Sequence, residues 1–197
     1  MNTIFDTHWL KDGEIESVIK ELTELNLIKY DKKGNLLLKS GGTTDLYINL
    51  RNARSNPEAI TRGSQLLSTP FNIYEQQVDR FVEIPHSISC LAGGISVATN
   101  TPYITIRDIP KDNRVSNSEV MGEYKEGDKV FIIDDVITDG ESKIIPYKKC
   151  MELGLEVLAI VVLVDREQGW PETFQENNIN VPVWAGMTLS QIREYIK

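Results

Sequence analysis

The sequence predicts an α/β fold in which a doubly wound, mostly parallel sheet is flanked by helices. Apolar runs alternate along the chain with segments of helical spacing, which is typical of a parallel sheet covered by helices. The runs over 130–133 and 157–164 are apolar throughout, as expected of strands buried on both faces. At 197 residues the chain suits one domain over 1–197, with an N-terminal hood over about 1–50 and a core over about 51–197.

The hood is predicted to begin with an amphipathic helix over 14–28, because apolar residues from Ile15 to Ile28 recur at helical spacing. A turn over 31–34, a strand over 36–39, a loop over 40–45 and a second strand over 46–50 follow. The two strands predict a hairpin-like extension of the core.

In the core, Asn56 and Pro57 suit the start of a helix that runs to about residue 68, since Asn caps helices and Pro is tolerated in the first turn. Strands are predicted over 78–84, 102–106, 129–135, 157–164 and 181–184. Helices are predicted over 90–98, 142–153, 171–177 and 189–196. Pro146 should delay or kink the second of these helices, because Pro lacks a backbone donor. Residues 108–123 lack apolar periodicity and predict a long loop.

The composition narrows the function classes and the location. A net charge of −8 argues against binding to nucleic acid through phosphate contacts. Cys90 and Cys150 provide neither a metal-ligand spacing nor a disulfide framework, which favours a reducing compartment. No apolar run is long enough for a membrane span, and the N-terminus lacks the pattern of a signal peptide. We therefore expect a cytoplasmic protein that binds neither nucleic acid nor membranes.

One stretch of the sequence predicts a ligand site. The strand over 129–135 ends in two carboxylates, Asp134 and Asp135, and a polar turn over 138–142 follows two apolar residues later. Such a turn, leading into a helix, offers backbone N–H groups to a phosphate, and the acids suit ribose hydroxyls or a hydrated divalent cation. Polar clusters at 85–89 and 165–169 also follow predicted strands. Because ligands of open α/β sheets bind at the carboxyl ends of strands, we expect the three clusters to meet there.

This stretch resembles the ribose-phosphate-binding signature of the type I phosphoribosyltransferases, which is an apolar run, two acids, two apolar residues and Thr-x-Gly-x-Ser. Three further stretches are similar to segments of the orotate phosphoribosyltransferases. They are Leu-Lys-Ser-Gly with Leu-Tyr-Ile-Asn-Leu-Arg within 38–51, Arg107 with Lys111-Asp112, and Asp-Arg-Glu-Gln-Gly at 165–169. The stretches occur in the family's order, and the resemblance runs from about residue 35 to the C-terminus.

The resemblance implies a type I phosphoribosyltransferase-like fold with an N-terminal hood of helix and strands. It implies transfer of ribose 5-phosphate from phosphoribosyl diphosphate to orotate, giving orotidine monophosphate and pyrophosphate in pyrimidine synthesis. It also implies Mg²⁺ as the cofactor and a homodimer in which the mobile loop of one subunit covers the site of its neighbour.

The site residues implied by the resemblance fall into three sets. Orotate would be bound by Lys39, Tyr47, Ile48, Thr138 and Arg166. Phosphoribosyl diphosphate would be bound by Lys39, His86, Ser87, Arg107, Lys111, Asp134, Asp135, Val136, Ile137, Thr138, Asp139, Gly140, Glu141 and Ser142. Catalysis would rest on Arg107, Lys111, Asp134 and Asp135, and the two acids would also hold Mg²⁺ indirectly, through water or the ligand. Arg166 suits the orotate carboxylate, because a planar guanidinium binds it with two parallel hydrogen bonds.

The sequence departs from the family where the diphosphate would bind. Asp108 replaces a basic residue of the loop, Asn113 replaces its His or Tyr, and Ile88 replaces a glycine of the diphosphate turn. These departures keep open an alternative, namely a catalytically weakened or inactive relative that binds nucleotide or phosphoribosyl diphosphate as a sensor or partner subunit. Transfer to another carboxylated base is a further alternative. Single residues also have structural interpretations: Arg166 could form a surface ion pair with Asp165 or Glu167, Lys39 could be solvated, and His86 could be structural.

Overall fold

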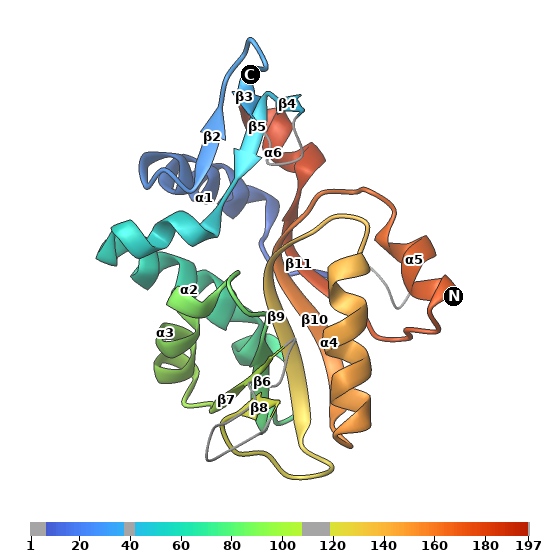
Figure 1. The fold of residues 1–197 in the computed structure, drawn as a ribbon. Coiled ribbons are helices and arrows are strands. Elements are labelled where there is room, and N and C mark those ends of the chain that lie inside the picture. Colours follow the sequence, from blue (N-terminus) through green and yellow to red (C-terminus); the bar gives the residue numbers. More distant parts are fainter. Residues whose placement is uncertain (1–6, 38–41, 108–118, 197) are drawn as a thin grey trace, which may run out of the picture.

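The computed structural model describes residues 7–37, 42–107 and 119–196. Its main sheet has seven strands, and six of them run parallel to their neighbours (Figure 1). Their order across the sheet is β1 (Thr7–His8), β11 (Val183–Thr188), β10 (Glu156–Asp165), β9 (Lys129–Ile137), β6 (Arg80–Glu83), β7 (Tyr103–Ile106) and β8 (Val120–Met121). Only β8, at the end of this order, pairs antiparallel with its neighbour, β7. The predicted doubly wound, mostly parallel sheet is confirmed.

Helices cover both faces of this sheet. One apolar core lies against α1 (Asp12–Glu24), α2 (Pro57–Ile73) and α3 (Ser89–Thr99), and a second core lies against α4 (Glu141–Glu152) and α5 (Trp170–Glu176). Side chains of β9 alternate between the two cores: Phe131 and Ile133 belong to the first, Val130 and Ile132 to the second. Because both faces of the strand are buried, its sequence is apolar without interruption.

The topology of the sheet creates a crevice between β6 and β9. From β6 the chain proceeds to β7 on one side, whereas β9 and then β10 lie on the other side of β6. Connections therefore leave the carboxyl ends of β6 and β9 in opposite directions. In open α/β sheets this switch point is where ligands bind, and both β6 and β9 are followed by segments that the sequence predicts to bind the ligand.

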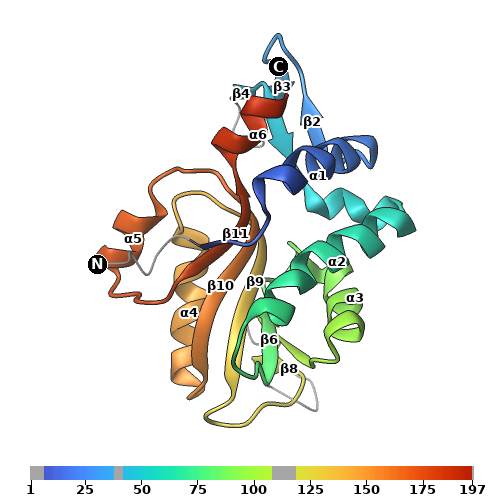
Figure 2. The ribbon, with the colours of Figure 1, turned by 180° about the vertical axis from the view of Figure 1, so that it is seen from behind.

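The hood consists of two small antiparallel sheets above the core, β2 (Ile28–Tyr30) with β5 (Leu46–Ile48) and β3 (Leu36–Leu37) with β4 (Thr43–Thr44) (Figure 2). It lies beside the C-terminal helix α6 (Leu189–Tyr195). Arg193 of α6 donates two hydrogen bonds, of 2.6 and 2.7 Å, to the carboxylate of Asp45. This ion pair lowers the pKa of Asp45 and fastens the hood to the core.

Several predicted boundaries in the hood and the long loop are wrong. The first helix ends at Glu24 instead of 28, because Asn26 takes a left-handed conformation and Ile28 pairs with Ile48 as the start of β2. Part of the loop predicted over 40–45 is the strand β4. The end of the loop predicted over 108–123 forms the strand β8, and the sequence analysis did not predict β1.

Boundaries in the core also differ from the prediction. Helix α2 continues past residue 68 to Ile73 and includes Pro70, and α4 starts at Glu141 with Pro146 in its interior rather than starting late. In α2, Leu66, Leu67 and Phe71 pack on the core, and this burial outweighs the hydrogen bond lost at Pro70. Strand β11 covers Val183–Thr188 rather than 181–184. Across the described ranges, no helix has the length and apolar character required to cross a membrane.

Candidate functional site

The three predicted ligand-binding segments meet at the carboxyl edge of the sheet. They follow β6, β9 and β10, which are parallel and adjacent. The backbone N–H of Arg166, after β10, donates to the carbonyl of Ile137 at the end of β9 at 2.9 Å. The buried side chain of Ser87, after β6, lies near enough to the carboxylate of Asp135 to oppose the rise of its pKa. The expected convergence is therefore present in the fold.

The two acids at the end of β9 have different surroundings. Asp134 is 4% exposed and forms an ion pair with Lys143 of α4, whose side chain is 2% exposed. Asp135 is 6% exposed and lies 3.9 Å from the guanidinium of Arg51, on the 3₁₀ helix η1 (Leu50–Ser55). Successive side chains of a strand point to opposite faces, which separates the two acids. Asp134 is in a close ion pair with Lys143, whereas Asp135 lies 3.9 Å from Arg51, near the limit for an ion pair. Asp135 is therefore the acid that is more available to a ligand.

Burial, which is the largest cause, and the negative charge of Asp134 together raise the pKa of Asp135 to about 6, against the opposing effects of Ser87 and Arg51. A carboxylate with this pKa gains a large part of its charge only near neutral pH. Cationic groups of a ligand, or a hydrated cation bound with it, would restore the charged form.

Replacing Asp135 by Asn is expected to stabilise the ligand-free protein at neutral pH. The folded-state pKa of about 6 lies above the ordinary value of 3.8 for an aspartate, so the folded state holds the proton more tightly than the unfolded state. The cost of ionising Asp135 is therefore absent below 3.8, grows between 3.8 and about 6, and is complete above about 6. The free energy of unfolding should rise by about 2–3 kcal/mol at neutral pH and not at about pH 4.

Urea unfolding of both proteins across this pH range measures the difference. Glu16→Gln, on the exposed face of α1, is a matched control that should change stability little at either pH. A stability gain for Asp135→Asn that is the same at both ends of the range would contradict the raised pKa.

The turn over 138–142, which is predicted to bind phosphate, contains an acid that accepts a hydrogen bond from one of the turn's own backbone amides. Oδ1 of Asp139 accepts a hydrogen bond from the N–H of Glu141 at 3.1 Å and one from the hydroxyl of Thr138 at 3.2 Å. Gly140 supplies the left-handed residue, φ 82°, that turns the chain into α4. A bound phosphate would therefore compete with Asp139 for the amide of Glu141.

Replacing Gly140 by Ala is expected to destabilise the protein by about 2–4 kcal/mol. An added Cβ would lie 2.8 Å from Cε1 of Phe174, and the positive φ would also strain an L-residue. Gly127→Ala is the matched control, because Gly127 has φ 85° but open space around its Cβ position. Thermal unfolding should show a larger loss for Gly140→Ala than for Gly127→Ala. Equal losses would mean that backbone strain alone is felt at both sites.

Arg166 is half-buried, and the carboxylates near it in sequence are engaged elsewhere. Asp165 accepts from the N–H of Glu167 at 2.7 Å and from Nε1 of Trp170 at 2.8 Å. Glu167 accepts from the N–H of Ser190 at 2.8 Å. Within the described part of the chain no ion pair holds Arg166, so the alternative of a surface ion pair with Asp165 or Glu167 is not seen. The guanidinium is available to an anionic ligand.

Helix α6 connects the predicted base-binding strand, β5, to the carboxyl edge of the main sheet. Tyr47 and Ile48 are half-buried residues of β5. Asp45, the residue before β5, binds Arg193 of α6. The other end of α6 contacts the loop of Arg166 through the hydrogen bond between Ser190 and Glu167. The hood strand and the Arg166 loop are thus held to the same helix. Lys39, predicted to contact both orotate and diphosphate, lies outside the described residues.

The loop that follows β7 begins beside the phosphate-binding turn. Arg107 is half-buried, and its N–H donates to the carbonyl of Glu119 at 2.8 Å. Arg107 and Ser142 both line a hollow of about 220 Å³. Lys111 lies outside the described residues, as do Asp108 and Asn113. Of the predicted catalytic cations, Arg107 is the one that the structure places.

The turn after β6, which is predicted to bind diphosphate, presents its two predicted contact residues differently: one side chain is exposed and the other is buried. The side chain of His86 is exposed, its φ is 65°, and its N–H donates to Oγ of Ser89 at 3.2 Å. Ser87, in contrast, is buried. Glu83, which the sequence analysis did not select, is buried at the end of β6 and accepts a hydrogen bond of 2.5 Å from the hydroxyl of Thr105. This buried acid adds negative charge next to the turn.

Two functional candidates, Lys143 and Arg51, were missed by the sequence analysis as site residues. Lys143 directly follows the Thr-x-Gly-x-Ser signature, where the signature specifies no residue type. Arg51 is the last residue of the segment within 38–51 that resembles the family, and its place in that segment could have identified it as a site residue. Neither contact could be recognised without the fold, since Arg51 and Asp135 are far apart in sequence.

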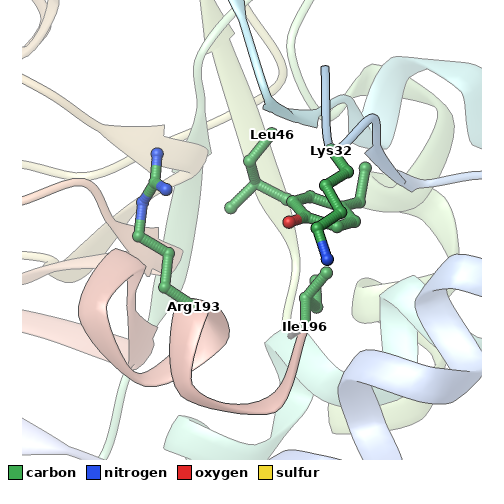
Figure 3. Close-up of a pocket in the computed structure, with 5 residues that line it drawn as sticks. Lys32, Leu46, Arg193 and Ile196 are labelled. Carbon is green, nitrogen blue, oxygen red and sulfur yellow. The ribbon is translucent and has the colours of Figure 1, made fainter. Parts of the chain in front are cut away.

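A further hollow, of about 300 Å³, lies between the hood and α6 (Figure 3). It is lined by Tyr30, Lys32, Leu46, Arg193 and Ile196. These residues belong to the hood and the C-terminal helix rather than to the carboxyl ends of the parallel strands. Arg193 is already paired with Asp45, so the hollow reflects how the hood rests on the core.

Comparison with known proteins adds to this geometry. No family model matches the chain. The chain is 32% identical over 168 residues to the orotate phosphoribosyltransferase of Methanocaldococcus jannaschii, which covers 83% of this chain and 89% of that protein. The solved UMP synthase of Leishmania donovani is 31% identical with a TM-score of 0.75, over 93% of this chain but only 38% of that protein's length. The orotate phosphoribosyltransferase of Aeropyrum pernix has a similar fold, with a TM-score of 0.72 at 22% identity over 91% of this chain and 97% of that one.

Proposed function

Because the chain belongs to the orotate phosphoribosyltransferase family, we propose that it transfers ribose 5-phosphate from phosphoribosyl diphosphate to a nitrogen of orotate. The products are orotidine monophosphate and pyrophosphate, in a step of pyrimidine synthesis. The observation that carries the proposal is the carboxyl edge of the sheet. There Arg166, which has no ion pair among the described residues, lies beside the strand that bears Asp135 and the turn over 138–142. The relatives are named as enzymes, which favours a transferase over a non-catalytic sensor or partner subunit.

In the proposed mechanism each segment binds one part of the substrates. Arg166 binds the orotate carboxylate with its guanidinium, next to Thr138 and the hood strand that carries Tyr47 and Ile48. The turn over 138–142 binds the 5′-phosphate, and Asp135 accepts hydrogen bonds from the ribose hydroxyls. The bond from the anomeric carbon to the diphosphate breaks while a bond to the orotate nitrogen forms on the opposite face, and the proton of that nitrogen is released to the departing diphosphate or to solvent. Arg107 stabilises the negative charge that builds on the leaving diphosphate.

We propose that Mg²⁺ accompanies phosphoribosyl diphosphate in this site. Mg²⁺ keeps several of its waters and is usually bound through one or two carboxylates together with substrate phosphates. The acid available for such an indirect contact is Asp135, because Asp134 is paired with Lys143. When bound, the cation would supply positive charge to the diphosphate.

A cytoplasmic homodimer is the assembly that we propose. Exposed apolar side chains support an interface with a second subunit: Val97 on α3 is 85% exposed, and Met121 on β8, the last strand of the sheet, is 48% exposed. Cys90 and Cys150 are both free thiols, which supports a reducing compartment.

The proposal is tested by following the ultraviolet absorbance of orotate in the presence of phosphoribosyl diphosphate and Mg²⁺. Orotate should be consumed only when both are present, and orotidine monophosphate should accumulate in equal amount. Uracil, which has the same ring without the carboxylate, is the matched control and should react far more slowly. No consumption of orotate by folded protein, or equal consumption of uracil, would contradict the proposed function.

A further inference from the structure

Lys143 is a buried ammonium group within the phosphate-binding segment. Its side chain is 2% exposed, and its Nζ donates hydrogen bonds to Oδ2 of Asp134, to the carbonyl of Val136 at 3.1 Å and to Oγ of Ser142 at 2.8 Å. A lysine ammonium has three donors, so all three are satisfied. A buried charge is costly unless it is paired and hydrogen-bonded, which makes this arrangement specific.

The three acceptors lie on both sides of the turn. Asp134 and Val136 belong to the end of β9, and Ser142 belongs to the first turn of α4. Lys143 therefore connects the strand before the phosphate-binding turn to the helix after it. A single buried side chain holds the two ends of the turn at a set distance, at the place where a ligand phosphate would enter.

The contact with Ser142 has a chemical consequence. The hydroxyl of Ser142 accepts a hydrogen bond from Lys143, so its own hydrogen is directed to another acceptor. Ser142 is exposed and lines the same hollow as Arg107. A phosphate oxygen bound at the turn over 138–142 would be a suitable acceptor for the Ser142 hydroxyl. A positive charge one hydrogen bond away strengthens this donation.

The positive charge of Lys143 also compensates part of the negative charge around the turn. Asp139 and Glu141 add negative charge around a site for an anion, and Asp134 adds a third acid. Lys143 neutralises Asp134 from inside the protein and leaves Asp135 to meet the ribose. The cation that neutralises Asp134 is therefore part of the protein.

We propose that Lys143 is a positioning residue for ribose 5-phosphate, which sets the phosphate-binding turn through Asp134, Val136 and Ser142 and directs the hydroxyl of Ser142 to the phosphate. This inference rests on the proposed function, because it assumes that the turn binds the 5′-phosphate. It assigns Asp134 a structural partner inside the protein, so that Asp135 is the acid that contacts the ribose or a hydrated cation.

The test compares Lys143→Met with the double variant Asp134→Asn, Lys143→Met, and uses ribose 5-phosphate as the probe in calorimetry. The single variant leaves Asp134 buried without its partner and should be less stable. The double variant removes both charges and should recover stability. Its dissociation constant for ribose 5-phosphate should nevertheless remain raised by about tenfold or more, because the hydrogen bond from the Lys143 ammonium to the Ser142 hydroxyl is lost. Lys148→Met, an exposed lysine of the same helix, is the matched control and should bind like the original protein.

The outcomes separate the two proposals. If the original protein binds ribose 5-phosphate and the stable double variant binds it equally well, Lys143 has only a structural role and the inference is overturned. If the original protein does not bind ribose 5-phosphate, the proposed phosphate site fails and the inference fails with it. Recovered stability together with weakened binding supports the positioning role.

Discussion

Replacing Arg166 by Ala is expected to weaken binding of orotate by about 30-fold to 1,000-fold. The guanidinium has no carboxylate partner among the described residues, since Asp165 and Glu167 accept hydrogen bonds from other groups. The variant therefore breaks no ion pair of the described structure and should remain folded. The loss would come from a two-pronged, charge-assisted contact with the ligand carboxylate, worth about 2–4 kcal/mol.

Calorimetric titration with orotate, in the presence of pyrophosphate and Mg²⁺, measures this effect. Arg166→Lys keeps the charge but not the planar fork, and should bind with intermediate affinity. Gln168→Ala, two residues away and exposed, is the matched control and should bind orotate as the original protein does. Unchanged affinity in Arg166→Ala would remove Arg166 from the base site.

Replacing Arg107 by Ala is expected to lower the turnover number by about 100-fold or more, with little change in affinity for orotidine monophosphate. Arg107 lies at the start of the loop and shares a hollow with Ser142 of the phosphate-binding turn. The nucleotide product lacks the diphosphate, so a cation that acts on the leaving group affects the rate more than product binding. The following residue is Asp108, where the family has a basic residue, so Arg107 should carry a larger share of this stabilisation.

Steady-state rates and calorimetry with orotidine monophosphate provide the two measurements. Arg62→Ala is a suitable control, because Arg62 of α2 pairs with Glu21 of α1, neither of which is a predicted site residue, and its loss should not affect turnover. An equal loss of product affinity in Arg107→Ala would place Arg107 at the 5′-phosphate or the base instead. An unchanged turnover number would show that another group neutralises the diphosphate.

The different surroundings of Asp134 and Asp135 connect these predictions to the fold. Two adjacent acids in the sequence suggest one joint role, yet the strand sends them to opposite faces. Asp134 pairs with Lys143 of α4, and Asp135 lies near Arg51 of the hood segment. One acid thus contributes to the structure of the phosphate-binding turn, and the other is placed to contact the ligand.

Local patterns in the sequence were enough to predict the fold class. Continuous apolar runs over β9 and β10 indicated strands buried on both faces, and Asn56 indeed caps α2 by accepting from the N–H of Glu58. The convergence of three polar segments also followed from general rules, because parallel strands place their carboxyl ends at one edge. Boundaries were less reliable: Ile28 suits the helical pattern by spacing but is held in β2 by pairing with Ile48.

The sequence by itself determined the doubly wound fold and the ribose-phosphate signature, and it suggested Arg166 as the candidate for binding a carboxylate, because each depends on residues that are close together in the chain. Only the tertiary structure decided that Arg51 lies near Asp135, that Lys143 neutralises Asp134 and that Arg193 fastens the hood through Asp45. Whether a charged group is free or paired depends on what the fold brings within about 4 Å of it, where an ion pair forms. Residue type and spacing carry no record of that distance.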